Sequence, residues 1–509
     1  MFSKVLSAAV YGVQSKVVQV EADITNGLPS FSMVGYLSTQ VKEAQERVRT
    51  ALKNSGIQLQ PKKITVNLSP ADLHKSGTGF DLPIAIAITA SYGLVDRERL
   101  EDTFIIGELS LNGKINGVPG ILPMAAKARS VQCSRCIVPW QNQREARAIE
   151  GIEVIGAETL EQVLAYLQTG EIPRVEETVQ EEAEKPKEKP DFYEVHGQDG
   201  AKRAALVAAA GFHNLLMIGP PGAGKSMIAS RIPGILPSMT EEEAIELSAI
   251  YSVIGKLPPN GSLIKERPFR APHHTITAKA LCGGGTIPGP GEISLAHCGV
   301  LFLDELPEFH RETLEILRQP LESGEVQIAR AGYQYTFPSQ FMLIGAMNPC
   351  PCGYYPDLSR CQCTCTEVKK YLGKISQSLL DRMDMTIEVS RVPFLDLDNE
   401  SSGTSSEQMR RKVESAREIQ KKRMLDRGKL FNSQMETKEL EHFCRLDGKR
   451  AEFMKKAFDE MKLSARGYAR ILKVARTIAD LEGAEEIELK HLQEALCYRS
   501  TVHMYWKGR

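Results

Sequence analysis

A glycine-rich loop between an apolar run and a predicted helix constrains this chain more than any other feature. Residues 215–218 are Leu-Leu-Met-Ile, and residues 219–226, Gly-Pro-Pro-Gly-Ala-Gly-Lys-Ser, match the pattern G-x-x-x-x-G-K-[ST]. In this context the glycines let consecutive backbone N–H groups turn inward as a nest for phosphate oxygens, and the following helix adds the positive end of its dipole. The motif therefore predicts a P-loop α/β domain with a nucleoside triphosphate site.

Each polar residue of the loop has its own expected role. The predicted phosphate-binding set consists of Gly219, Pro220, Pro221, Gly222, Ala223, Gly224, Lys225 and Ser226. We expect the Lys225 ammonium to contact the β- and γ-phosphates, and the Ser226 hydroxyl to be a Mg²⁺ ligand. The expected cofactors are therefore ATP and Mg²⁺.

A second apolar run predicts the strand that carries the catalytic carboxylates. Residues 299–303, Gly-Val-Leu-Phe-Leu, suit a parallel strand covered on both faces, and Asp304 and Glu305 follow directly. We expect Asp304 to hold Mg²⁺ through its water shell and Glu305 to polarise the water that attacks the γ-phosphate. An acidic pair after a strand is common in turns, so this prediction depends on its combination with the upstream glycine loop.

Size and charge exclude several classes of protein. The 509 residues exceed what one hydrophobic core supports and predict two to four domains. We expect a cytoplasmic protein without membrane contact, because no apolar run approaches membrane-spanning length and the N-terminus lacks the sections of a signal peptide. With a net charge of -1, any DNA-binding surface must be local, such as a pore or a groove.

Composition divides the chain into three domains and a linker. Residues 171–190 are rich in Glu, Lys and Pro and predict a solvated linker. We expect a mixed α+β domain over residues 1–170 and the nucleotide-binding core over residues 191–395. Helical periodicity after a Ser/Gly-rich stretch predicts a helical module over residues 396–509.

Three polar residues beyond the catalytic carboxylates are candidates for completing the ATP site. Asn348 ends the apolar run 341–347 and fits a sensor of the γ-phosphate, although Asn also ends strands in turns before proline. Arg382 stands between two acidic residues, where it either pairs locally or is an arginine finger for the nucleotide of a neighbouring subunit. Arg466, in the first turn of a predicted helix, is the expected second sensor, with Arg470 as the alternative.

The order of these motifs resembles the YifB/ComM family of magnesium-chelatase-like AAA+ ATPases over nearly the whole chain. The matching segments are 197–198, 208–214, 219–226, 270–275, 290–297, 299–306, 348–353, 379–384 and 475–481. This resemblance implies an α/β fold in which an AAA+ core with a parallel sheet and a helical C-terminal lid follows a Lon-protease-like α+β domain. It also implies a homohexameric ring that hydrolyses ATP and moves on branched or single-stranded DNA. The implied activity is helicase-driven branch migration in recombination during natural transformation.

The N-terminal domain resembles Lon-type protease domains at residues 75–81 and 104–120. In the Lon pattern the serine nucleophile falls where Gly79 stands, and the lysine base falls near Leu122. A glycine cannot attack and a leucine cannot take a proton, so the Ser–Lys mechanism cannot operate at these positions. We therefore expect a binding or assembly module and not a protease.

A cluster of cysteines follows the predicted sensor strand. Cys350, Cys352, Cys361 and Cys363 form a C-x-C…C-x-C set, in a chain whose eleven cysteines are unlikely to be a disulfide framework in a reducing compartment. Four thiolates at this density are able to close a tetrahedral Zn²⁺ site, whereas the alternative is a loop with free thiols. The family resemblance favours these four, and the nearby Cys365 is a competing ligand.

Two segments of the core are candidates for contact with DNA. Residues 280–291 are too rich in glycine for a helix interior and predict a mobile pore loop. Residues 326–337 predict a β-hairpin with Arg330 near its tip. We expect Arg330 to contact phosphate, and Tyr333 or Tyr335 to stack on bases. An arginine on a solvated hairpin is the alternative.

Two other functions compete with a DNA motor. One is the motor subunit of a metal chelatase, and the other is a chaperone or adaptor that ATP only switches. The Lon-like domain and the cysteine cluster favour the DNA motor over the chelatase subunit. Glu305 beside Asp304, with Arg382 available, favours turnover over switching. His273 and His274 are interpreted as structural.

Overall fold

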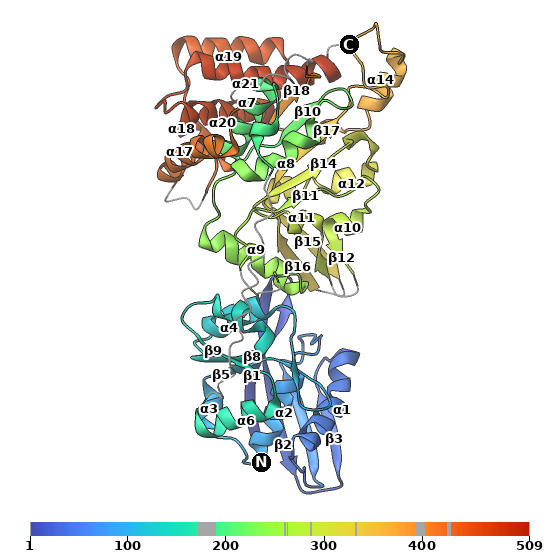
Figure 1. The fold of residues 1–509 in the computed structure, drawn as a ribbon, viewed down its shortest axis with the longest axis vertical. Coiled ribbons are helices and arrows are strands. Elements are labelled where there is room, and N and C mark those ends of the chain that lie inside the picture. The colour runs from blue at the N-terminus through green and yellow to red at the C-terminus, as the bar shows by residue number, and fades with distance from the viewer. Residues whose placement is uncertain are drawn as a thin grey trace.

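The structure is a computed structural model, and it describes residues 2–171, 190–258, 261, 263–285, 288–330, 333–392, 403–424 and 429–507. The N-terminal domain lies at one end, the nucleotide-binding core in the middle and the C-terminal helices at the other end (Figure 1). Apart from its two end residues, the predicted linker 171–190 lies outside the described residues, as do residues 286–287 of the predicted pore loop and residues 331–332 of the predicted hairpin.

The N-terminal domain is built on a seven-stranded sheet with the order β3-β4-β2-β1-β5-β8-β9. Its strands are β1 (Phe2–Tyr11), β2 (Gln14–Thr25), β3 (Ser30–Val34), β4 (Lys63–Ser69), β5 (Thr103–Ile105), β8 (Arg135–Pro139) and β9 (Glu153–Ala157). Strands β1, β2 and β4 are antiparallel, whereas β3, β5, β8 and β9 pair in parallel with their neighbours. A short ladder of β6 (Glu108–Leu109) and β7 (Ile115–Asn116) stands apart from this sheet.

The helices of this domain are α1 (Thr39–Asn54), α2 (Asp81–Ser91), α3 (Glu98–Glu101), α4 (Ile121–Ser130), α5 (Gln143–Arg147) and α6 (Leu160–Thr169). Every residue of α2 is buried, because its sequence is apolar on all sides and it packs against β1 and β2. Helix α1 is amphipathic: it buries Val41, Ala44, Val48, Ala51 and Leu52 and turns its polar side chains to solvent. The α+β character of the domain follows from these elements.

The core contains a five-stranded parallel sheet with the order β11-β14-β17-β10-β18. Its strands are β10 (Leu215–Ile218), β11 (Phe269–Arg270), β14 (Val300–Leu303), β17 (Met342–Met347) and β18 (Met385–Glu388). All residues of β10, β14 and β17 are buried, as expected for parallel strands covered on both faces. Because these three strands are neighbours, their carboxyl ends meet at one edge of the sheet.

Helices surround the core sheet, and two hairpins extend from it. The helices are α7 (Asp199–Gly211), α8 (Lys225–Ile235), α9 (Glu241–Val253), α10 (Ala278–Cys282), α11 (Glu292–Leu295), α12 (Arg311–Ile316), α13 (Pro320–Ser323), α14 (Cys365–Leu372) and α15 (Gln377–Leu380). The predicted pore loop contains the short hairpin of β12 (Gly283–Gly284) and β13 (Gly289–Pro290). The second hairpin pairs β15 (Glu325–Arg330) with β16 (Tyr333–Pro338).

The C-terminal region is helical and shares a hydrophobic core with the five-stranded sheet. It comprises α17 (Ser406–Met424), α18 (Thr437–Phe443), α19 (Gly448–Glu460), α20 (Ala465–Leu481), α21 (Leu489–Val502) and the π-helical turn η6 (His503–Lys507). One hydrophobic cluster runs from β10, β14 and β17 through α7 and α8 into α17, α20 and α21. The predicted fold class, an α/β core with a helical C-terminal part, is therefore confirmed. No helix in the described part of the chain is long and apolar enough to span a bilayer.

Candidate functional site

The phosphate-binding loop connects β10 to α8 at the edge where the strand ends meet. Gly224 has a φ angle of 85°, a left-handed conformation that glycine adopts without strain. A Cβ atom at Gly219 would lie 2.1 Å from the carbonyl oxygen of Val389, so only glycine fits there. Helix α8 begins at Lys225, and its N-terminal end faces the loop. This geometry is that of an anion-binding turn.

Lys225 is buried beneath this loop and held by neutral oxygen atoms. Its Nζ donates to the carbonyl oxygen of Gly219 at 2.7 Å and to Oδ1 of Asn348 at 3.2 Å. Burial lowers the pKa of Lys225, and the negative charges of Asp304 and Glu305 partly oppose this shift. The ammonium group therefore lies between the loop and the end of β17, where the predicted sensor stands.

Ser226 and Asp304 meet at the same edge of the sheet. The Ser226 hydroxyl donates to Oδ2 of Asp304 at 2.6 Å. Hydroxyl and carboxylate oxygens are the hard ligands that Mg²⁺ prefers, so this pair fits a magnesium site. Together with Glu305, Asn348 and the phosphate-binding loop, they line a cavity of about 410 Å³. The structure thus gathers the predicted loop, metal-binding, catalytic and sensor residues around one space.

His274 lies beside Glu305, although the sequence analysis assigned this histidine a structural role. Its Nδ1 is 3.4 Å from Oε2 of Glu305, and its ring lies 4.0 Å from that of His273 between centroids. Glu305 has a φ angle of 50°, in the left-handed region that non-glycine residues rarely adopt. The signal that could have identified His274 is the position of segment 270–275, which continues from β11 next to β14.

Arg382 and Arg466 meet at a shared carboxylate away from this cavity. Arg382 is buried, and its Nη2 lies 2.6 Å from Oε1 of Glu322, while Nη1 donates to the carbonyl oxygen and the hydroxyl of Ser378, each at 2.7 Å. Arg466 is largely exposed, with Nη1 3.4 Å from the same oxygen of Glu322. Neither arginine lines the nucleotide cavity of its own chain.

The ion pair of Arg382 is therefore local, but it is made with Glu322 of α13 and not with the acidic residues beside it in the sequence. A role toward the nucleotide of a neighbouring subunit stays a prediction. Arg470, the alternative second sensor, forms an ion pair with the fully buried Asp384 and donates to the carbonyl oxygen of Arg382 at 3.0 Å. Burial alone would raise the pKa of Asp384, but the charge of Arg470 holds that pKa below its usual value. This pair links α20 to the residue that precedes β18.

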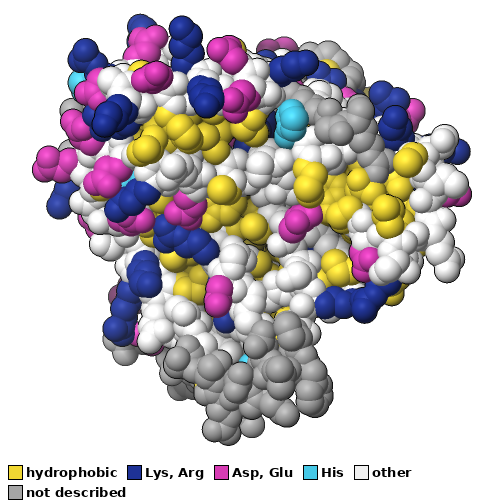
Figure 2. Space-filling model, turned by 90° about the horizontal axis from the view of Figure 1, so that it is seen from above, with side chains coloured by type: hydrophobic (Ala, Val, Ile, Leu, Met, Phe, Trp, Pro, Cys, Tyr) yellow, Lys and Arg dark blue, Asp and Glu magenta, His cyan; other side chains and the backbone are white. Residues whose placement is uncertain are grey.

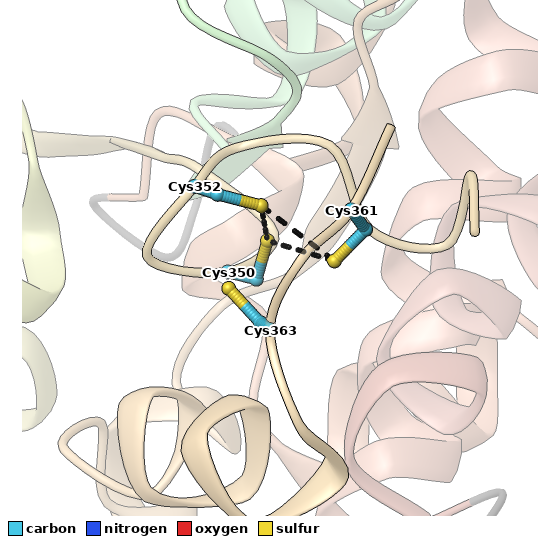
Figure 3. A group of neighbouring side chains, drawn as sticks. All are labelled: Cys350, Cys352, Cys361 and Cys363. Carbon is cyan, nitrogen blue, oxygen red and sulfur yellow. Dashed lines mark hydrogen bonds between the residues drawn. The ribbon is translucent and has the colours of Figure 1, made fainter. Parts of the chain in front are cut away.

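Four cysteines converge in the loop that follows β17. Cys350, Cys352, Cys361 and Cys363 place their sulfur atoms within 4.8 Å of one another, pointing to a common centre (Figure 3). The Sγ separations are 3.3 Å for Cys350–Cys352, 3.8 Å for Cys350–Cys361 and 3.6 Å for Cys352–Cys361. A tetrahedral Zn²⁺ site with Zn–S bonds of about 2.3 Å requires S–S separations of roughly 3.8 Å, so the cluster fits zinc. Cys365 is exposed and lies outside this group.

The cysteine loop touches the phosphate-binding loop. Gly353 has a φ angle of 84°, and a Cβ atom there would lie 2.4 Å from Cδ of Pro221. Residues 348–353 thus run from the predicted sensor, through the first cysteine pair, to the back of the phosphate-binding loop. The two loops are therefore in direct contact at Gly353 and Pro221.

The N-terminal domain contains no catalytic pair at the two Lon-like positions. A Cβ atom on Gly79 would face the methyl groups of Ile106 at 3.5 Å and Val118 at 3.9 Å. Leu122 is buried in the hydrophobic cluster that also contains these two residues. Both positions therefore adjoin apolar side chains, and a binding or assembly role for the domain stays a prediction.

The hairpin of β15 and β16 leans against the N-terminal domain. Arg330 is exposed and pairs in register with Tyr333. The Tyr335 ring stacks on Tyr11 with 5.6 Å between centroids, and the Tyr333 hydroxyl donates to the carbonyl oxygen of Asp72. In this arrangement the two hairpin tyrosines contact the N-terminal domain, and their stacking on bases stays a prediction. The contact of Arg330 with DNA stays a prediction.

Comparison with known proteins follows the domain order of the chain. The model for subunit ChlI of Mg-chelatase matches residues 20–142, that for magnesium chelatase subunit ChlI matches residues 191–397, and that for the ChlI C-terminal region matches residues 403–499. Competence protein ComM of Haemophilus influenzae is 46% identical over 507 residues, covering 99% of this chain and 98% of that protein.

Two further relatives differ in how much of the chain they cover. Protein YifB of Escherichia coli is 42% identical over 503 residues, covering 98% of this chain and 97% of that protein. The 38 kDa subunit of magnesium chelatase from Rhodobacter capsulatus is 24% identical over 217 residues, which is 39% of this chain and 55% of the subunit. Similarity along the whole chain is therefore found with ComM and YifB and only partial similarity with the chelatase subunit.

Proposed function

The chain belongs to the magnesium-chelatase-like AAA+ family that includes ComM and YifB, and we propose that it is an ATP-hydrolysing motor that acts on DNA. The observation that carries the ATPase part is the convergence at the carboxyl ends of β10, β14 and β17. There Lys225 contacts Asn348, Ser226 contacts Asp304, and Glu305 lines the same cavity. These are the groups that bind a triphosphate and position a water for attack on it.

Each residue contributes a separate step to the proposed reaction. The loop amides and Lys225 bind the phosphate chain, and the helix dipole of α8 favours its negative charge. Ser226 and Asp304 would hold Mg²⁺, which neutralises charge on the phosphate oxygens when bound. Glu305 orients the attacking water and accepts its proton, and Asn348 positions the γ-phosphate against Lys225. The buried position of Lys225 keeps this charge out of bulk water, where its attraction for phosphate would be weaker.

The proposal for the target of the motor is DNA. It is supported by similarity over the whole chain, the N-terminal domain included, to a protein named for competence. We propose a homohexameric cytoplasmic ring that acts as a helicase in branch migration during recombination of incoming DNA. In such a ring the exposed Arg330 and the hairpin of β12 and β13 would face the nucleic acid.

We also propose that the four clustered cysteines bind one Zn²⁺ per chain. The sulfur geometry supports this, because separations of 3.3 to 3.8 Å are too long for a disulfide and close to the edges of a tetrahedral thiolate site. Zinc would fix the loop that joins the sensor to the phosphate-binding loop.

A steady-state ATPase assay with and without forked DNA tests the proposed function. Stimulation of turnover by forked DNA over a non-branched duplex supports a DNA motor. Turnover that no DNA structure changes supports the motor subunit of a metal chelatase, which the partial similarity to the 38 kDa subunit makes the second candidate. Nucleotide binding without turnover supports an ATP-switched adaptor. The Glu305→Gln variant sets the background rate.

A further inference from the structure

A groove on the N-terminal domain is lined by cationic, amide and apolar side chains. It is a cavity of about 590 Å³ between the edge strand β3, helix α1 and residues 56–64, which lead into β4. This volume lies within the range of roughly 300–1,000 Å³ that is common for ligand pockets. Helix α1 and β3 lie on the outer side of the domain, away from the ATPase core (Figure 1). The groove is therefore separate from the nucleotide site.

The charged side chains that line this groove are all cationic. Arg49 and Lys53 stand one turn apart on α1, about 6 Å along the helix axis, and Lys62 approaches from the opposite wall. No Asp or Glu lines the groove, and among the described residues no ion pair joins these three cations to a carboxylate. By contrast, cationic and acidic side chains are interspersed on the end of the molecule that carries α19 (Figure 2). The groove is thus a local positive site on a chain with a net charge of -1.

The floor of the groove is apolar and its rim carries amides. Phe31 and Leu59 are partly buried and pack on the hydrophobic core of the domain, leaving part of each side chain in the groove. Gln45 and Gln58 add side-chain amides, which both donate and accept hydrogen bonds. The hydroxyl of Tyr92 donates to the carbonyl oxygen of Gln60 at 3.1 Å and so ties the wall to the core.

We propose that this groove binds single-stranded DNA. Arg49, Lys53 and Lys62 would contact phosphates, and the exposed part of Phe31 would receive a base, with the glutamine amides on the base edge. The carboxylates of an acidic peptide would pair with the cations. They would not stack on Phe31 as a base does, and they would form fewer hydrogen bonds with the glutamine amides. The inference deepens the proposed function, since it depends on DNA being the target, and it gives the N-terminal domain a role in holding a strand while the core works on it.

Fluorescence anisotropy with a labelled thirty-nucleotide oligo-dT tests the groove in the full-length protein with a non-hydrolysable ATP analogue. The Arg49→Ala/Lys53→Ala variant should bind at least tenfold more weakly. The plot of log affinity against log salt should become less steep by about 1.4, since each lost contact to a single strand removes roughly 0.7. The Lys438→Ala/Lys455→Ala variant, which removes two exposed lysines from the C-terminal helices, is the matched control and should bind as the wild type does.

Cross-linking locates the strand directly. Phe31→p-benzoylphenylalanine should cross-link to oligo-dT on irradiation, whereas the same change at the exposed Phe458 should not. If the wild type binds oligo-dT but the double variant binds equally well with an unchanged salt slope and position 31 gives no cross-link, the groove proposal is overturned and the proposed function stands. If the wild type binds no DNA of any structure, both fail. If poly-glutamate binds more tightly than DNA and prevents the cross-link to oligo-dT, the groove binds an acidic peptide and not DNA.

Discussion

Two glycine-containing loops in this molecule lead into helices, and the side chains around them are arranged differently. Before α8, the loop opens on a cavity lined by Ser226, Asp304 and Asn348 from neighbouring strand ends and the helix itself. Before α2, Gly79 faces the carbon atoms of Ile106 and Val118. Both loops contain glycines before a helix, but the side chains next to those glycines differ.

The charged residue at the start of α2 shows how a polar group next to this loop is used. Asp81 is fully buried, and both of its carboxylate oxygens accept from Arg47, at 2.7 Å from Nε and 2.9 Å from Nη2. Burial raises the pKa of Asp81 while the Arg47 bonds oppose that shift, so the carboxylate is committed to a structural pair. The loop before α8 differs because adjacent parallel strands bring Asp304 and Asn348 to the cavity on which it opens.

The strongest test of this contrast removes, in separate variants, two charged groups from the cavity beside the loop before α8, with different expected results. Lys225→Ala should abolish nucleotide binding, because the ammonium is the buried positive charge of the site. Glu305→Gln should keep nucleotide binding and reduce hydrolysis by about 10³-fold, within the range for loss of a general base. Isothermal titration with an ATP analogue and a phosphate-release assay separate the two effects. Equal loss of nucleotide affinity in both variants would contradict the division of roles.

The next test asks whether the open site is completed by a neighbouring subunit. Arg382→Ala should still bind ATP, because Arg382 does not line its own cavity, but should lose turnover on the order of 10³-fold if it reaches the next subunit's nucleotide. Mixing Arg382→Ala chains with Lys225→Ala chains creates interfaces with one intact site and one intact arginine. Mixed rings should regain part of the ATPase activity. Subunit exchange, confirmed by native mass spectrometry, without recovery at any mixing ratio would contradict a shared site.

The loop before α2 can be tested by introducing the serine and the lysine of the Lon pattern at positions 79 and 122. Gly79→Ser/Leu122→Lys should give no peptidase activity on casein and should destabilise the N-terminal domain, because Leu122 is buried among apolar side chains. A lysine whose pKa falls by about three units on burial costs about 4 kcal/mol at neutral pH. Gly79→Ser alone is the control and should change the melting temperature much less. Peptidase activity in the double variant would show that the two loops differ less than their surroundings indicate.

Much of the open site was predictable from sequence because its parts are short and local. The glycine loop, the carboxylates after an apolar run and the paired cysteines are each defined within a few residues, and parallel strands bring their ends together by topology. Contacts between distant segments were not predictable. The Glu322 carboxylate that engages Arg382 and the Tyr11 ring that covers Tyr335 depend on the packing of whole domains, and no local pattern encodes that packing.

A smaller effect is expected at His274, which lies beside Glu305, the proposed catalytic carboxylate. If the imidazole orients Glu305, His274→Ala should lower kcat about tenfold, equivalent to about 1.4 kcal/mol, without changing affinity for an ATP analogue. His310→Ala removes an exposed imidazole near Glu305 in the sequence and is the matched control. A change in nucleotide affinity without a change in kcat would mean that His274 shapes the binding site and does not position the carboxylate.

The smallest effect on activity is expected from the four clustered cysteines, whose loop contacts the phosphate-binding loop where Gly353 meets Pro221. Inductively coupled plasma mass spectrometry of the purified protein should find about one Zn²⁺ per chain, because one tetrahedral thiolate site binds one ion. Cys350→Ser/Cys352→Ser should remove the metal and weaken nucleotide binding about threefold, since the loop behind the phosphate site loses its anchor but the phosphate ligands remain. Cys365→Ser, outside the cluster, is the matched control and should keep both metal and affinity.

Because Gly353 transmits the effect, Gly353→Ala should weaken nucleotide binding while retaining zinc. Loss of zinc with unchanged nucleotide affinity would show that the cysteine loop folds independently of the phosphate site. If protein prepared without chelators contains no zinc, the four cysteines are free thiols and the zinc prediction is wrong.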